Sequence, residues 1–194
     1  MATKTKILVF AGATREGSFN KKLAKLAAKA AGDAGADVTL VDLKDYPMPL
    51  YDGDDESASD LPPKALEFKK LVKEADGYII ASPEYNSGYS GVLKNAIDWA
   101  SRPSEAGEGS AAAFFGKYAG LMAASPGALG GLRGLYALRE LMMNINVTVL
   151  PRMQAVGGAG AAFNDDGSLK EEKFAKGVAG IAADLVKLLQ KTKA

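Results

Sequence analysis

Short apolar runs alternate along this chain with longer segments in which apolar side chains recur every three or four residues. Apolar runs of this length predict β-strands, and the longer period predicts helices that bury one face. Strands are expected at residues 7–10, 38–41, 78–81, 118–123 and 147–150. Because these runs are apolar throughout, we expect helices on both faces of the sheet that they form.

Helical segments lie between and after these runs, at residues 20–31, 63–75, 91–100, 132–143 and 170–191. Gly32 and Gly35 are expected to end the first helix, and Pro63 suits the first turn of the second. Apolar stripes mark the buried sides of the first, third and last helices. They consist of Leu23, Leu26, Ala27 and Ala30, of Leu93, Ala96, Ile97 and Ala100, and of Phe174, Val178, Ile181, Leu185 and Leu188.

This alternation predicts a doubly wound α/β fold with a five-stranded parallel sheet, in a single domain over residues 1–194. Right-handed crossovers favour the strand order 2-1-3-4-5. Ligands of such sheets bind beyond the carboxyl ends of the strands, where the order reverses between strands 1 and 3. The loops after the first, third and fourth strands are therefore the candidate site.

Composition narrows the chemistry of that site. The 194 residues include no cysteine and no histidine. This excludes disulfides, thiolate metal sites, a thiol nucleophile, Ser-His-Asp catalysis and nearly all zinc chemistry. An enzyme of this composition works if a cofactor carries the difficult step.

The net charge and the hydropathy of the chain limit its possible binding partners and its cellular location. A formal net charge of +1 favours neither nucleic acid nor an anionic membrane as the main partner. No apolar run approaches the roughly 20 residues of a membrane span. The N-terminus reaches a glycine loop within about ten residues, which is too short for a secretory signal. We expect a cytoplasmic protein without membrane insertion.

The loop after the first strand, residues 12–20, leads into a helix whose first N–H groups and positive dipole end attract an anion. Thr14, Arg15, Ser18 and Asn20 add hydroxyls, a guanidinium and an amide, which suit one phosphate. The loop has neither the Walker pattern nor the dinucleotide glycine pattern, so a monophosphate is the better expectation. The alternative is that Ser18 or Asn20 caps the helix and that Arg15 is merely solvated.

The loop after the third strand, residues 82–91, carries Tyr85 and Tyr89 among proline, asparagine and glycine residues. The two tyrosine rings could form a wall beside a planar heterocycle, and the main chain of the loop can donate hydrogen bonds to the polar edge of that heterocycle. The alternative is that these tyrosines only cover core, as Trp99 is expected to do. The loop after the fourth strand, residues 125–131, has small and turn residues that let the backbone approach a ligand.

These segments resemble a known family. The chain has Gly-x-x-Arg-x-x-Ser-x-Asn after the first strand, Pro-Glu-Tyr-Asn after the third, and then Gly-x-Leu-Lys-Asn-Ala-Ile-Asp-Trp. These motifs are similar to those of the NADPH-dependent FMN reductases, which include quinone, chromate and azo-dye reductases. The resemblance runs from the first strand to the last helix. It implies a flavodoxin-like fold and an FMN-dependent oxidoreductase, with NADPH or else NADH as the electron donor.

The resemblance also implies how the FMN phosphate is held. Arg15, Ser18 and Asn20 would bind it, with help from Thr14 and nearby backbone amides. The family usually has Gly-Ser before this arginine motif, whereas Ala13 takes the place of the serine here. One phosphate hydrogen bond is then missing unless Thr14 replaces it. The loss of this bond would weaken FMN binding without abolishing it.

For the flavin ring, the resemblance implies main-chain contacts along the isoalloxazine and ribityl chain, with the third loop closing the other side. The residues concerned are Pro83, Glu84, Tyr85 and Asn86 on one side and Ser125 and Gly127 on the other. Family members commonly form dimers or tetramers. Residues 91–99 and 130–136 resemble segments that contribute to their subunit contacts.

The mechanism implied by the resemblance is a ping-pong cycle in which nicotinamide passes hydride to flavin N5 and an oxidised acceptor then takes the same place. Quinones, chromate, azo or nitro compounds and free flavin are all candidate acceptors. Two alternatives remain: a flavodoxin-type electron carrier, and a domain that has lost FMN. The carrier would favour a strongly acidic face and a Thr-x-Thr-Gly-x-Thr loop, and the chain has a net charge of +1 and no such loop.

Overall fold

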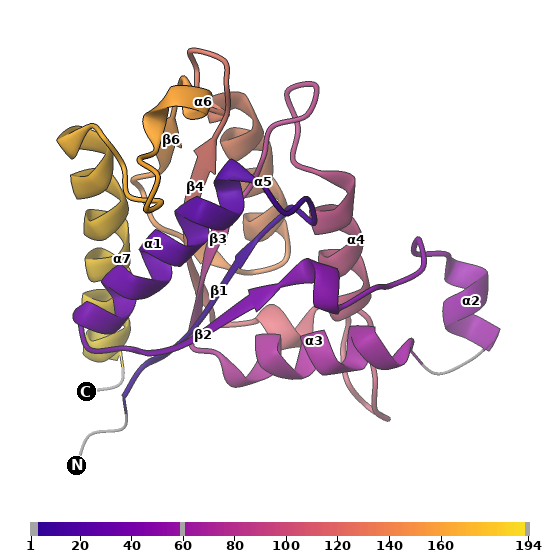
Figure 1. Cartoon of the computed structure of the whole chain (residues 1–194). Coiled ribbons are helices and arrows are strands. Elements are labelled where there is room, and N and C mark those ends of the chain that lie inside the picture. Colours follow the sequence, from indigo (N-terminus) through magenta and orange to yellow (C-terminus); the bar gives the residue numbers. More distant parts are fainter. Residues whose placement is uncertain (1–3, 59–60, 193–194) are drawn as a thin grey trace.

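The computed structural model describes residues 4–58 and 61–192, so the ends of the expected domain lie outside the described residues. Its centre is a parallel sheet (Figure 1). The strand path β2-β1-β3-β4-β5 confirms the predicted order, and a further strand, β6, pairs with β4. The strands are β1 (Lys6–Ala11), β2 (Asp37–Asp42), β3 (Gly77–Ala81), β4 (Tyr118–Ala124), β5 (Thr148–Val149) and β6 (Gln154–Val156).

Helices cover both faces of the sheet, and the five predicted helices are confirmed (Figure 1). One face carries α1 (Phe19–Asp33) and α7 (Glu172–Thr192), and the other carries α3 (Pro63–Glu74), α4 (Gly91–Ala100) and α5 (Leu132–Asn144). Each face has its own apolar cluster. Short helical segments were not predicted; they are Leu43–Asp45, α2 (Gly53–Ala58), Ala112–Phe114 and α6 (Ala159–Ala162).

Strand β2 does not have the two-sided burial that its apolar run predicted. All residues of β3 are buried, whereas Leu40 of β2 is 43% exposed and Thr39 is also exposed. The reason is position: β2 lies at the edge of the sheet, beside β1. Val38 and Val41 are half-buried against opposite apolar clusters. An apolar run predicts a strand, but it does not predict where in the sheet that strand lies.

The fifth apolar run forms a shorter strand than predicted. The Leu150 N–H still donates to the Ala119 carbonyl oxygen, at 2.8 Å. Pro151 has no N–H group and cannot continue the ladder. Pairing with β4 resumes at Gln154, which is the register partner of Met122. The strand expected at residues 147–150 is therefore shortened to β5, and β6 is a further strand that was not predicted, so the sheet has six strands among the described residues.

Two details of the helices also differ from the expectation. Helix α1 continues through Gly32, and Gly35 makes the left-handed turn after it, with a φ of 97°. In α7, Leu189 is fully buried, whereas Phe174 and Leu188 are half-buried. The buried face of α7 also includes Ala182 and Val186, so its centre lies towards Leu189 and leaves Leu188 at its edge.

Trp99 covers core, as expected. Its side chain is 1% exposed, and its indole N–H donates to the Pro49 carbonyl oxygen at 2.9 Å. In the part of the chain that the structure describes, no helix is both long and apolar enough to cross a membrane.

Candidate functional site

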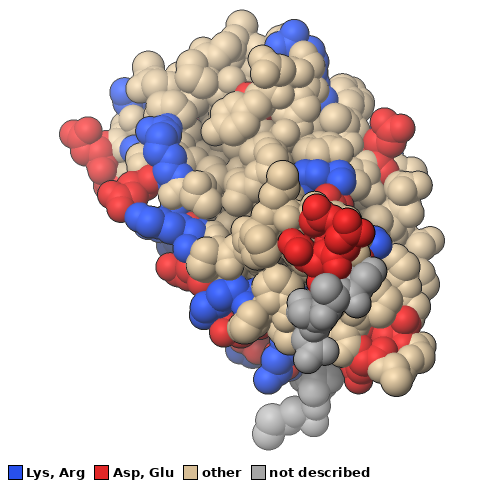
Figure 2. Space-filling view, turned by 90° about the vertical axis from the view of Figure 1, so that its right-hand side faces the viewer, with Lys and Arg blue, Asp and Glu red and all other residues tan. Residues whose placement is uncertain are grey.

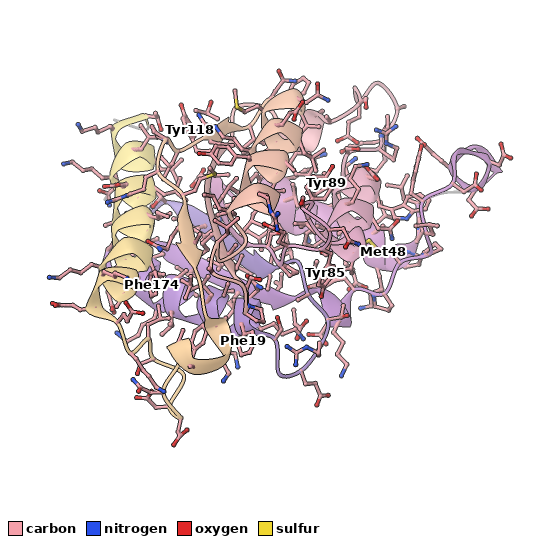
Figure 3. All side chains as sticks on the ribbon, turned by 90° about the horizontal axis from the view of Figure 1, so that it is seen from above. Phe19, Met48, Tyr85, Tyr89, Tyr118 and Phe174 are labelled. Carbon is pink, nitrogen blue, oxygen red and sulfur yellow. The ribbon has the colours of Figure 1, made fainter. Side chains whose placement is uncertain are left out.

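Three loops leave the carboxyl ends of neighbouring strands: the β1 loop (12–18), the β3 loop (82–90) and the β4 loop (125–131). The Gly12 N–H donates to the Ala81 carbonyl oxygen, and the Ser82 N–H donates to that of Met122, both at 2.9 Å. These bonds carry the strand pairing one residue into the loops. Figure 3, seen from above, looks onto this end of the sheet. All the predicted site residues lie on these loops or at the start of α1.

The predicted phosphate-binding side chains of the β1 loop differ in exposure. Thr14 and Arg15 are exposed, and the Arg15 guanidinium carbon lies 5.9 Å from the centroid of the Phe19 ring. Ser18 is buried and caps α1, where its hydroxyl accepts from the Lys21 N–H at 3.5 Å. Thr14 and Arg15 are accessible to a ligand, whereas Ser18 has the capping role that the sequence left as an alternative.

Asn20 joins the start of α1 to the end of β4. Its side-chain amide donates to the Ala124 carbonyl oxygen, and its amide oxygen accepts from the Ala124 N–H, both at 2.9 Å. Both atoms are buried, so this pair satisfies backbone groups that water cannot reach. Asn20 is 3% exposed, so this predicted phosphate-binding side chain is buried against Ala124.

Ser90 ties the β3 loop to the β1 loop and was not among the predicted site residues. Its buried hydroxyl donates to the Gly12 carbonyl oxygen at 2.6 Å and accepts from the Leu93 N–H at 3.2 Å, so Ser90 caps α4. A β-carbon at Gly12 would lie 2.9 Å from the Leu93 Cβ, so the close approach requires glycine. A serine before a helical run signals a cap, but its link to Gly12, 78 residues away, has no sequence signal.

The β3 loop ends in a tight hairpin. The Tyr85 N–H donates to the Gly88 carbonyl oxygen at 2.9 Å, and the Gly88 N–H donates to that of Tyr85 at 3.0 Å. Between them, Asn86 and Ser87 have φ values of 51° and 68°, as a type I′ turn requires. Tyr85 is 60% exposed, so core cover is the wrong interpretation for it. Tyr89 is half-buried and packs against the core, which fits that interpretation.

Pro83 is buried, and the side chain of Glu84 turns to α5. The Glu84 carboxylate accepts from the Arg133 guanidinium, at 2.7 and 2.9 Å, and from the Gly134 N–H at 3.0 Å. The Gly134 N–H lowers the pKa of Glu84 most, and the Arg133 charge acts in the same direction against the effect of burial. Glu84 therefore stays ionised, and its main chain is the part left for a ligand.

The β4 loop packs on a segment that the sequence did not single out. Ser125 is half-buried and Gly127 is exposed. A β-carbon at Gly130 would lie 2.6 Å from the Gly157 nitrogen, and one at Gly157 would lie 2.5 Å from the Ala128 carbonyl oxygen. The turn after β6 thus packs directly against the backbone of the β4 loop. No periodic pattern marks this turn, because β6 is only three residues long.

Three side chains link the segments at this end of the sheet. Asn20 joins the start of α1 to the end of β4, Ser90 joins the β3 and β1 loops, and Glu84 joins the β3 loop to the helix after the β4 loop. Each of these three links includes a hydrogen bond to a backbone group. The links therefore hold the backbone of these segments at set distances. We call the three loops and the first turn of α1 the rim. The rim surrounds the carboxyl ends of β1, β3 and β4.

The rim fits a phosphate monoester that carries a flat ring system. A phosphate needs N–H donors and a cation, and the start of α1 and Arg15 provide them. The first turn of α1 has no acidic residue. Glu16, the carboxylate in the β1 loop, is paired with Lys44 at 2.8 Å. The exposed ring of Tyr85 and the main chain of the hairpin provide a wall for the flat part.

Comparison with known proteins identifies the family of the chain. Residues 5–161 match the NADPH-dependent FMN reductase family. An NAD(P)H-dependent FMN reductase of Pseudomonas aeruginosa is 35% identical over 89% of this chain and 89% of its own. A 2-hydroxy-1,4-benzoquinone reductase of Burkholderia sp. is 40% identical over 71% of this chain and 73% of its own.

A solved structure is similar over nearly the whole length. FerB of Paracoccus denitrificans, a flavoenzyme NAD(P)H:(acceptor) oxidoreductase, superposes with a TM-score of 0.80 at 29% identity, over 96% of this chain and 98% of its own. The strand order is that of flavodoxin-like folds. These similarities confirm the expected flavodoxin-like fold. They also confirm FMN as the cofactor and NAD(P)H as the electron donor of the family. From its loop motifs, its sheet and this similarity, the chain belongs to the NADPH-dependent FMN reductase family of oxidoreductases.

Proposed function

We propose that this protein uses FMN to pass electrons from NAD(P)H to small oxidised molecules, with quinones as the first acceptor class to test. The observation that carries the proposal is the rim, in which the side chains of Asn20, Ser90 and Glu84 link neighbouring segments beside the exposed Arg15. Chromate, azo and nitro compounds and free flavin suit the same open rim. All three loops come from one sheet, so the proposal includes one functional domain over residues 1–194.

The chain's own part is to bind and orient. Arg15, with Thr14 beside it, and the first N–H groups of α1 hold the phosphate. Pro83 and the hairpin lie along one side of the ring system, and Ser125 and Gly127 lie along the other. When bound, FMN supplies the chemistry by accepting hydride and passing electrons on. The chain has no histidine or cysteine, so its residues orient the reactants and exclude water.

The proposal includes a homodimer or homotetramer in the cytoplasm, where NAD(P)H is available. Figure 2 shows that the upper part of the face on the α4 side carries few charged side chains. Tyr136 and Met143 on α5 are 59% and 55% exposed, and Leu129 in the β4 loop is 53% exposed. Large apolar side chains in such numbers favour contact with another subunit. Of the two segments concerned, 91–99 and 130–136, the second includes Tyr136 and directly follows Leu129, and Met143 lies further along the same helix.

The test is the visible absorption spectrum of the purified protein before and after anaerobic addition of NADPH. We expect flavin bands at about 370 and 450 nm that bleach within seconds. A quinone added next should restore them. NADH in place of NADPH then measures the donor preference.

The other outcomes separate the alternatives. A protein that holds FMN but bleaches slowly would be an electron carrier that needs a separate reductase. A colourless protein that also fails to take up added FMN would contradict the proposal and favour a domain that has lost its cofactor. Analytical ultracentrifugation decides the subunit number.

A further inference from the structure

Glu84 extends from the β3 loop into the first turn of α5. Its side chain is 8% exposed, although that of its partner Arg133 is 62% exposed. One carboxylate oxygen accepts from both Nε and Nη2 of Arg133, and the other accepts from the Gly134 N–H. Helix α5 has no side-chain cap of its own at Gly131. Glu84 therefore supplies, from another loop, the negative charge and the acceptor that a helix start requires.

Two glycines shape the surface that receives this carboxylate. A β-carbon at Gly134 would lie 3.1 Å from the Gly88 carbonyl oxygen and 3.2 Å from the Cβ of Glu84. A β-carbon at Gly131 would lie 2.7 Å from the Cβ of Ala123. Glu84 and the hairpin thus pack on the bare backbone of α5, closer than a side chain would allow.

The hairpin needs this support because of its backbone. Asn86 and Ser87 both lie in the left-handed region, which asparagine adopts readily but which is uncommon for serine, so Ser87 depends more on its surroundings. Glu84 is two residues before Asn86, and it anchors the hairpin to α5. The β3 loop and the β4 loop, which leads into α5, are thereby held at one separation.

We propose that Glu84 is a positioning residue whose bond to the start of α5 sets the gap between the β3 and β4 loops that receives the flavin ring. The inference rests on the proposed function. It assigns the side chain of Glu84 to the neighbouring helix, with no contact to the phosphate. It follows that loss of this bond weakens binding of the ring system, whereas loss of Arg15 weakens binding of the phosphate.

The first test compares two flavins, FMN and riboflavin, which lacks the phosphate. Protein freed of flavin is titrated with each, and affinity is read from quenching of flavin fluorescence. Glu84→Gln is expected to weaken both flavins by the same factor, about tenfold for one charge-assisted hydrogen bond. Arg15→Ala is expected to weaken FMN alone. Arg133→Gln should weaken both less, and the double variant should be no weaker than Glu84→Gln.

A control removes an arginine–carboxylate pair that involves none of the rim residues. Arg152 and Asp184 pair at 2.5 Å, with 53% and 56% of their side chains exposed. Asp184→Asn is expected to leave both flavin affinities unchanged. Circular dichroism and the thermal midpoint establish that each variant is folded.

A second variant keeps every charge in place. Gly134→Ala puts a β-carbon against Gly88 and Glu84, while alanine favours the helical state more than glycine does. The two effects on folding oppose one another, so the thermal midpoint should change little. Affinity for both flavins should fall by the same factor. Such a separation of affinity from stability would not result from general destabilisation.

The last measurement needs no flavin. Chymotrypsin cleaves after tyrosine, and Tyr85 is exposed at the start of the hairpin. In the flavin-free protein, cleavage after Tyr85 should be several-fold faster for Glu84→Gln than for the wild type or Asp184→Asn. Equal cleavage rates, or a loss of FMN affinity with riboflavin affinity retained, would overturn the inference. A wild-type protein that binds no flavin would instead contradict the proposed function, while the cleavage result would still decide whether Glu84 holds the hairpin.

Discussion

Two glutamates tie loops to helices in this protein, in different surroundings. Glu108, in the loop between α4 and β4, pairs with Lys69 of α3 at 2.6 Å, and their side chains are 7% and 3% exposed. Glu84 is 8% exposed, but its partner Arg133 is 62% exposed. One pair is buried on both sides, whereas water reaches the cation of the other.

This difference separates support of the fold from support of the site. When one partner of a buried pair is removed, the other charge is left without compensation or water. When Arg133 is removed, water can partly replace its interaction with the Glu84 carboxylate. We therefore expect changes at Lys69 and Glu108 to act on the free energy of unfolding. Changes at the rim should act mainly on flavin affinity.

The largest expected effect is at Lys69. Lys69→Met keeps most of the side-chain volume but leaves the Glu108 carboxylate buried without its closest cation. Loss of one partner of a buried pair costs about 3–5 kcal/mol in the free energy of unfolding. Urea unfolding measures this cost, and FMN affinity of the folded protein should be unchanged.

The matched control for Lys69 is on the same helix. Lys64 pairs with Glu67 at 2.6 Å, with 44% and 54% of their side chains exposed. Lys64→Met should leave the unfolding midpoint nearly unchanged. If both variants were equally stable, burial would not be what distinguishes the two kinds of tie.

Acid should weaken the same buried pair. Burial by itself would raise the pKa of Glu108, but hydrogen bonds from Lys69, Ser104 and Lys73 outweigh it and lower that pKa from 4.5 to about 2. A carboxyl with a lowered pKa stabilises the fold above its unfolded value and loses this contribution as pH falls through its folded value. The contribution is worth about 3 kcal/mol.

We therefore expect the free energy of unfolding to fall between pH 4.5 and 2. Glu108→Gln should be less stable near neutral pH and should lose less on acidification across that range. Urea unfolding at a series of pH values measures both. An equal loss for both proteins would assign the acid sensitivity to other carboxylates.

At the rim, the largest effect on FMN is expected at Arg15. Its guanidinium is exposed, so Arg15→Ala should leave the unfolding midpoint nearly unchanged. Loss of a charge-assisted hydrogen bond to phosphate costs about 1.5–3 kcal/mol, which is about tenfold to a hundredfold in FMN affinity. Lys25→Gln, at an exposed lysine of α1, is the control. Equal effects of the two variants would indicate only a general attraction for anions.

The smallest effect is expected at Ala13, which stands where the motif of the resembling family has serine. Ala13 is 5% exposed at the start of the β1 loop. Ala13→Ser should strengthen FMN binding by at most about tenfold, because it restores one hydrogen bond to phosphate. Riboflavin affinity should not change. A fall in FMN affinity would indicate that the buried hydroxyl finds no partner, and that Thr14 already fills this role.

Much of the fold follows from local pattern. The predicted helix at residues 91–100 has the bounds of α4, and Trp99 lies in the core as expected. Such features depend on neighbours within one or two turns, so periodicity reports them. The candidate loops could also be located, because the strand order of an alternating chain is strongly restricted.

The places where local pattern failed depend on distant neighbours. Leu40 is exposed because β2 has a neighbouring strand on one side. Pro151 interrupts the last strand, and the short β6 returns to the same neighbour. Neither outcome is encoded in the hydrophobic run itself. An apolar run records the tendency to form a strand, while burial depends on what packs beside it.

The amino-acid sequence by itself thus determined five strands and five helices, the order of those strands in the sheet and the three loops of the candidate site, since these follow from local periodicity and chain connectivity. Only the tertiary structure decided how the loops are held. Asn20 and Ala124 are 104 residues apart, Ser90 and Gly12 are 78 apart, and Glu84 and Arg133 are 49 apart. A hydrogen bond across such distances forms because folding brings both groups out of water at one place, and no local pattern records that encounter.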